Sequence, residues 1–166
     1  MISSSESLRI VTMFAAVGCG LMAGLLFAFS NFVMKALSRQ TPESSVRTMQ
    51  AINAFIQNPV FFLVFFGTTL TTAFLAVTAV AELSQPGAVL QLAGCVAYLA
   101  GTFVVTVAVH VQLNNGLALH DPKTAETAQY WFYYVGRWLP WNHVRTVCAL
   151  AATALLILSV HQQVHA

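Results

Sequence analysis

VTMFAAVGCGLMAGLLFAFSNFVM, residues 11–34, is the stretch that decides the fold class of this chain. It contains no charged residue, and its 24 residues exceed the roughly 20 that a helix needs to cross the hydrocarbon layer of a membrane. The apolar core of a secretory signal is only about 7–15 residues long. We therefore expect the stretch to be retained as a membrane-spanning helix.

Three further apolar runs follow. Residues 48–81 and 83–116 contain no Asp, Glu, Lys or Arg, and the last run, residues 141–160, contains only one. Of all 166 residues, 58% are hydrophobic and 7% are charged, whereas about a quarter are charged in soluble domains. The sequence predicts an all-α integral membrane four-helix bundle that forms one domain over residues 1–166. The expected spans are about residues 10–36, 60–82, 89–117 and 141–160.

The two longer connections are expected to contain helices as well. Residues 42–57 place apolar side chains at Val46, Met49, Ile52 and Ile56, a helical spacing that predicts a short amphipathic helix at the membrane surface. A polar helix is expected at about residues 123–137, before the fourth span. Pro140 follows it, and proline suits the first turn of a new helix.

The distribution of Lys and Arg predicts the orientation. Six of the seven lie on the side of the connections between spans 1 and 2 and between spans 3 and 4, and only Arg9 lies on the other side. Positive charge favours the cytoplasm, so both termini are expected on the non-cytoplasmic side. The net charge of +2 is too small to indicate a nucleic-acid partner.

Gly20 and Gly24 form a stripe of small residues on the first span. Such a stripe lets another helix approach closely. It serves either packing within the bundle or a homodimer.

Polar chemistry is concentrated in YWFYYVGRWLPWNHVRT, residues 130–146. Arg145 either reaches the membrane surface or faces a cavity as a fixed cation. Asn142, three residues earlier on the same helical face, either holds it or caps the helix. His143 lies about 100° around the helix from Asn142 and need not face the same cavity.

A second polar patch lies near the end of the third span, where His110 and Asn114 are four residues apart and share a helical face. An imidazole among apolar neighbours is expected to be neutral, the form that a general base needs. The alternative is a structural histidine bonded to Thr106 or Asn114.

Aromatic side chains surround the polar cluster. Seven lie within residues 130–141, more than anchoring at the membrane surface requires. Trp138 and Trp141 are therefore candidates for binding a flat aromatic ligand. Asn31, near the end of the first span, either caps nearby backbone or faces the bundle interior.

Other classes of chemistry find no support in the sequence. It contains no Cys-x-x-Cys, no His-Glu-x-x-His and no glycine-rich phosphate loop, so no metal site is predicted. No acidic residue lies in the interior of an expected span, since Glu82 is at the very end of the second, which argues against a proton-coupled transporter.

Four segments carry a resemblance over nearly the whole chain: GLLFAFSNFVMKAL (24–37), MQAIN (49–53) with Pro59, VQLNNGL (111–117) and RWLPWNHVRT (137–146). Together they resemble the anthrone oxygenase family of small four-helix membrane proteins. Lys35 departs from the family, many of whose members have proline there. By motif position, the residues that match the family's polar set are Asn114, Trp138, Asn142, His143 and Arg145.

The resemblance implies that O₂ oxidises a polycyclic anthrone to an anthraquinone without metal or flavin. It also implies a bacterial inner membrane as the location. His110 or His143 would serve as the base, Arg145 as the cation, and Asn114 and Asn142 as orienting amides. A competing hypothesis is a non-enzymatic protein that binds haem through His110 and His143, or a quinone or lipid, between spans 3 and 4. A third is a packing subunit of a larger complex.

Overall fold

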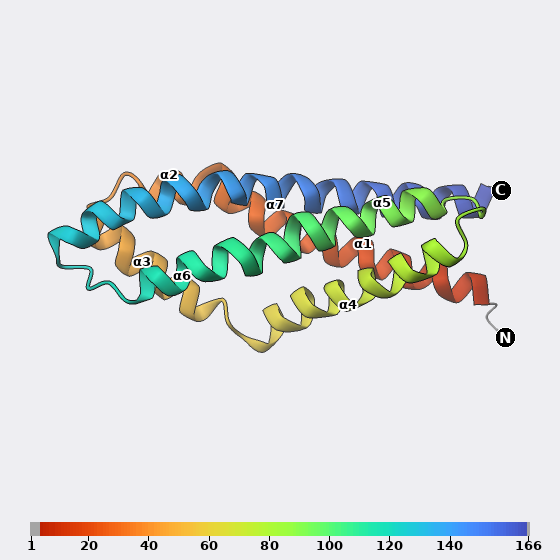
Figure 1. Cartoon of the computed structure of the whole chain (residues 1–166), viewed down its shortest axis with the longest axis horizontal. Helices are drawn as coiled ribbons and strands as arrows, with labels where there is room; N and C mark the ends of the chain where they lie inside the picture. The colour runs from red at the N-terminus through yellow and green to blue at the C-terminus, as the bar shows by residue number, and fades with distance from the viewer. Residues whose placement is uncertain (1–3, 166) are drawn as a thin grey trace.

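Long helices run side by side along the molecule in the computed structural model, which describes residues 4–165 (Figure 1). Within these residues, four helical stretches are long and apolar enough to cross a membrane. They are Ser5–Leu37, Pro59–Ala81, Ala88–Ala118 and Ala125–His165. The all-α helix bundle predicted from the sequence is confirmed, and so is its integral membrane character.

The first half of the chain contains α1 (Ser4–Ala28), η1 (Phe29–Val33), α2 (Met34–Leu37), α3 (Pro42–Phe55) and α4 (Pro59–Ala81). The first three form one continuous span, in which η1 is a π-helical segment with a wider turn. The Thr41 hydroxyl accepts a hydrogen bond from the Ser44 amide at the start of α3. The predicted amphipathic helix is confirmed by α3, which buries Val46 and Met49.

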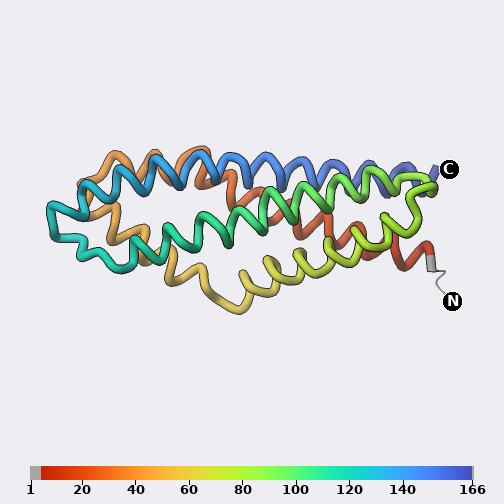
Figure 2. The backbone as a smooth tube through the Cα atoms, in the orientation of Figure 1, coloured from red at the N-terminus to blue at the C-terminus, as the bar shows by residue number. Residues whose placement is uncertain are grey.

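The second half contains α5 (Ala88–Tyr98), η2 (Leu99–Val104), η3 (Thr106–His110), α6 (Val111–Ala118) and α7 (Ala125–His165). Here η2 and η3 are π-helical segments within the third span. The turn before α5 contains Gly87 at φ 79°, a backbone conformation that favours glycine. Both chain ends lie at the same end of the bundle as this turn (Figure 2).

The predicted break at Pro140 is wrong. The polar helix expected at residues 123–137 and the fourth span form one helix of 41 residues, with Pro140 inside it. A proline within a helix removes one backbone hydrogen bond, but side chains from neighbouring helices can satisfy nearby carbonyls in a membrane bundle. The carbonyl that loses its partner is that of Gly136, and the His110 ring contacts a different carbonyl, that of Trp138, on the same side of the proline.

Close contacts between helices set the core. Gly18 faces the Thr68 side chain of α4, and Gly101 faces Cys148 of α7, at distances that leave no room for a Cβ atom. Two large apolar clusters and a small one of Ala23, Leu26 and Ala149 fill the interior of the described residues. One, around Tyr98 and Leu156, lies along the middle and the terminal end, and the other, around Met49 and Trp138, lies at the end with the long connections.

The small-residue stripe takes part in packing at one position. A methyl group at Gly20 would lie 3.7 Å from the Thr153 side chain of α7, whereas one at Gly24 would meet nothing within 4 Å. Gly20 thus faces the bundle interior and Gly24 does not. A homodimer through this face stays a prediction.

Candidate functional site

A cavity of about 270 Å³ lies between the loop-side ends of the spans and α3. Its walls come from α1, η1, α3, α4, η3, α6 and α7. Most of the lining side chains are aromatic or aliphatic, and none is Asp or Glu. Apolar walls with a few polar groups are typical of small-molecule sites.

Arg145 is the one charged residue in this lining. Its side chain is 6% exposed. Nη1 donates to the Thr106 hydroxyl at 3.1 Å and Nη2 donates to Asn142 Oδ1 at 2.6 Å. Nε is buried and has no hydrogen-bond partner within residues 4–165. Two of the three guanidinium nitrogens therefore donate hydrogen bonds. No carboxylate in the described residues balances the charge of the group.

Asn142 holds Arg145 against the first span. Its side-chain nitrogen donates to the Leu26 carbonyl at 2.9 Å and to the Ser30 hydroxyl at 2.8 Å, while its oxygen accepts from Arg145. The predicted contact between Asn142 and Arg145 is confirmed. Asn142 lies in mid-helix rather than at a helix start, and it does not line the cavity. It acts as a positioning residue.

The π-helical segments η2 and η3 bring three polar side chains of the third span to α7. The Thr102 hydroxyl donates to the Arg145 carbonyl at 3.3 Å. The Thr106 hydroxyl accepts from Arg145 and donates to the Thr102 carbonyl at 2.6 Å. His110, at the end of η3, is buried beside Trp138. π-Helical turns occur often at functional sites, and here they coincide with the surroundings of the buried cation.

Both ring nitrogens of His110 face backbone carbonyls. Nε2 lies 3.1 Å from the Trp138 carbonyl and Nδ1 lies 3.4 Å from the Val105 carbonyl. A carbonyl can only accept, and a neutral imidazole has one N–H, so the shorter contact favours the hydrogen on Nε2. The predicted alternative of a bond to Thr106 or Asn114 is replaced by these backbone contacts.

Trp138 is fixed from several sides. Its indole Nε1 donates to Asn114 Oδ1 at 3.1 Å. Its ring packs against Phe29 and His110, and the Arg145 guanidinium carbon lies 5.4 Å from its centroid. A cation over an indole face is stabilised electrostatically. Trp138 thus forms a rigid wall between the cation and the Asn114 amide.

The structure does not bring every predicted site residue to the cavity. His110, Asn114, Trp138 and Arg145 line it. His143, Trp141 and Asn31 are exposed and lie outside its lining. His110 and His143 therefore face different surroundings, and a haem held between the two rings finds no support in their placement.

Asn53 is a lining residue that the sequence analysis did not single out. Its amide nitrogen is buried without a hydrogen-bond partner among the described residues. The available signal was its position on α3, where Met49, Ile52 and Ile56 share its helical face and also line the cavity. A single amide on the apolar face of an amphipathic helix indicates a possible contact with a polar group in the interior.

The mouth of the cavity has a largely apolar rim. Phe62 and Phe66 on α4 and Val107 and Val111 on the third span all line it and are between 40% and 48% exposed. These side chains lie on helices whose outer surfaces are rich in exposed Val, Leu and Phe, which suits contact with lipid. The cavity therefore opens between α4 and η3–α6 towards the hydrocarbon layer.

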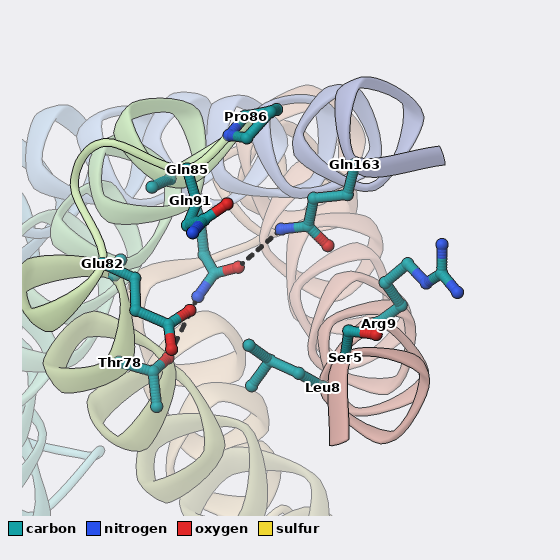
Figure 3. A pocket seen from close by; sticks show the side chains of 11 residues that line it. Ser5, Leu8, Arg9, Thr78, Glu82, Gln85, Pro86, Gln91 and Gln163 are labelled. Carbon is teal, nitrogen blue, oxygen red and sulfur yellow. Dashed lines mark hydrogen bonds between the residues drawn. The ribbon is translucent and has the colours of Figure 1, made fainter. Parts of the chain in front are cut away.

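A second, larger cavity of about 560 Å³ lies at the end of the bundle that contains both termini (Figure 3). Its lining includes Arg9, Glu82, Gln91 and Gln163. The Gln91 amide is buried between the helices, and dashed lines in Figure 3 mark its bonds to Thr78 and Gln163.

Comparison with known proteins gives a family for the chain. A family model described as anthrone oxygenase matches residues 61–155, more than half of the chain. The residues that line the cavity and lie in the matched segment include Thr106, His110, Asn114, Trp138 and Arg145. No curated protein and no solved structure matches the chain. The chain belongs to the anthrone oxygenase family.

Proposed function

We propose that this protein is a membrane-embedded monooxygenase that uses O₂ to oxidise an anthrone-like polycyclic aromatic, without metal or flavin. One observation carries the proposal: a buried guanidinium without a counter-ion forms part of the wall of an apolar, aromatic cavity. A buried charge is costly unless it is balanced. A substrate that develops negative charge in the cavity would supply that balance.

The chemistry fits this arrangement. Removal of one proton from the CH₂ carbon of an anthrone gives an enolate, which transfers one electron to triplet O₂. Recombination of the radical pair forms a C–O bond and a peroxide. Loss of the second C–H proton and cleavage of the O–O bond then give the quinone carbonyl and one water. Both electron pairs come from the substrate, so the balanced reaction requires no further reductant.

Each side chain has a role in this scheme. Arg145 stabilises the negative charge on the enolate oxygen, where a preorganised cation is most effective because water is excluded. His110, whose ring lines the cavity, accepts the proton. Trp138 and Phe29 hold the flat rings. O₂ reaches the site readily because it is more soluble in hydrocarbon than in water.

The first prediction tests the cation. Replacing Arg145 with Met keeps an unbranched apolar stem but removes the guanidinium and its charge. Loss of one preorganised electrostatic group slows catalysis by about 10²–10³-fold. We expect a decrease of that size in O₂ uptake by purified protein supplied with anthrone, while the fold is retained.

Arg137→Met is the matched control, since Arg137 is an exposed arginine on the same helix that contacts Tyr133 instead of the cavity. Its turnover should equal that of the unmodified protein. Undiminished turnover in Arg145→Met would exclude the proposed role of the cation. No O₂ uptake by the unmodified protein with any of a panel of anthrones would exclude the proposed reaction.

A further inference from the structure

At the end of the cavity that contains Asn114, side-chain N–H groups are left without a hydrogen-bond acceptor. Asn114 Oδ1 accepts from both the Tyr134 hydroxyl, at 2.7 Å, and the Trp138 indole nitrogen, at 3.1 Å. An indole nitrogen can only donate, so the contacted atom of Asn114 must be its oxygen. Both acceptor positions of that oxygen are thus occupied, and the amide NH₂ group is left for the cavity.

Asn53 adds a second free donor at the same end. It lies beside the Tyr134 hydroxyl, which donates to Asn114 but is not within hydrogen-bond geometry of the Asn53 nitrogen. The Asn53 nitrogen is buried with no partner in the described part of the chain. An unsatisfied buried donor destabilises the unliganded protein, and a ligand oxygen would remove that cost.

This donor pair is separated from the cation. Arg145 bonds to Thr106, and Asn114 lies eight residues further along the same span, or roughly 12 Å of helix. Between them the cavity is lined by the rings of Trp138 and His110 and by Val107 and Val111. The cavity therefore has polar groups at two ends and flat or apolar surfaces between them.

We infer that Asn53 and Asn114 form a second subsite, which binds an oxygen atom on the edge of the ligand opposite the oxygen held by Arg145. The ligand class is a planar polycycle with one acceptor oxygen on each of two opposite edges. The inference rests on the proposed function in one respect: the oxygen at this subsite is the one that the reaction introduces. Asn53 is then a specificity-determining residue. The site is complementary to the oxidised ligand, which carries both oxygens.

Ligand binding tests the subsite without turnover. The full-length protein in lipid nanodiscs is titrated, under anaerobic conditions, with anthracene, anthrone and 9,10-anthraquinone, which carry no, one and two oxygens. Empty nanodiscs give the correction for partition into lipid. The unmodified protein is expected to bind anthraquinone most tightly. Asn53→Leu should weaken anthraquinone binding about tenfold, the equivalent of one hydrogen bond, and leave anthracene binding unchanged.

Two controls separate the subsite from a packing role. Gln112→Leu changes an exposed amide on α6 outside the cavity lining and should leave all three affinities unchanged. Asn53→Leu should not lower the midpoint of thermal unfolding, because the Asn53 nitrogen makes no bond that the substitution removes. A lower midpoint, or an equal loss of affinity for anthracene, would overturn the inference.

The inference and the proposed function fail in different ways. If Asn53→Leu binds anthraquinone as the unmodified protein does, the subsite is wrong even when Arg145→Met abolishes turnover. If the unmodified protein consumes no O₂ but prefers the two-oxygen ligand through Asn53, the subsite stands and the proposed oxygenation does not.

Discussion

The two cavities of this protein differ in how their buried polar groups are satisfied. At the terminal end, the Gln91 nitrogen donates to the Leu75 carbonyl and to Thr78, and its oxygen accepts from Gln163. In the smaller cavity, Nε of Arg145 and the side-chain nitrogen of Asn53 remain without partners among the described residues. The larger cavity thus has a completed amide network that joins helices. The smaller one has unmade bonds, which is the better indicator of a ligand site.

The largest effect on stability is expected from Asn142. Asn142→Leu removes both bonds to the first span and leaves the Arg145 charge without its closest partner. Losing a hydrogen bond to a charged group costs about 1.5–3 kcal/mol, and losing the two bonds to the first span as well brings the total to about 3–5 kcal/mol. The free energy of unfolding in mixed micelles should fall by this amount. An unchanged value would show that Arg145 does not depend on the Asn142 amide.

A smaller loss is expected from Gln91. Gln91→Leu leaves the Leu75 carbonyl and the Gln163 amide with fewer partners, which should reduce the free energy of unfolding by about 1–3 kcal/mol. Because the terminal cavity has no part in the proposed site, affinity for anthraquinone should be unchanged. A loss of affinity for anthraquinone without a loss of stability would indicate that the terminal cavity, and not the smaller one, binds the ligand.

The smallest effect is expected on the surface. Arg47 and Glu43 form an exposed ion pair one turn apart on α3, at 3.0 Å. Exposed pairs of this kind contribute about 0.3–0.5 kcal/mol. Glu43→Gln should therefore change the free energy of unfolding by less than about 0.5 kcal/mol in the same micelle measurement. A decrease of 2 kcal/mol or more would indicate that α3 depends on surface charge rather than on its buried face.

The helices were predictable because their composition leaves few alternatives. A charge-free stretch as long as residues 11–34 belongs in a membrane, where every backbone polar group needs a hydrogen-bond partner within the protein. A helix supplies these partners within one segment. The contact between Asn142 and Arg145 was predictable for a similarly local reason: residues three apart share a helical face. Both predictions depend on neighbours in sequence.

The features that the sequence did not predict depend on contacts between segments that are far apart in the sequence. Pro140 is a local signal for a helix start, but buried contacts on both sides of it, through Trp138 and Asn142, hold one continuous helix. His110 and His143 were both candidates for the base, with His110 favoured by its apolar neighbours, and the packing of η3 on α7 places only His110 at the cavity. Asn53 was overlooked because a surface helix was expected to face lipid and water, not a cavity.

The apolar rim of Phe62, Phe66, Val107 and Val111 has a consequence for how activity should be measured. A ligand that reaches the cavity through hydrocarbon is supplied by the bilayer, which acts as a reservoir. Its effective concentration is a mole fraction in lipid, set by partitioning rather than by aqueous solubility. At a fixed total amount of substrate, adding empty vesicles would dilute it and slow turnover, although the volume of the sample barely changes.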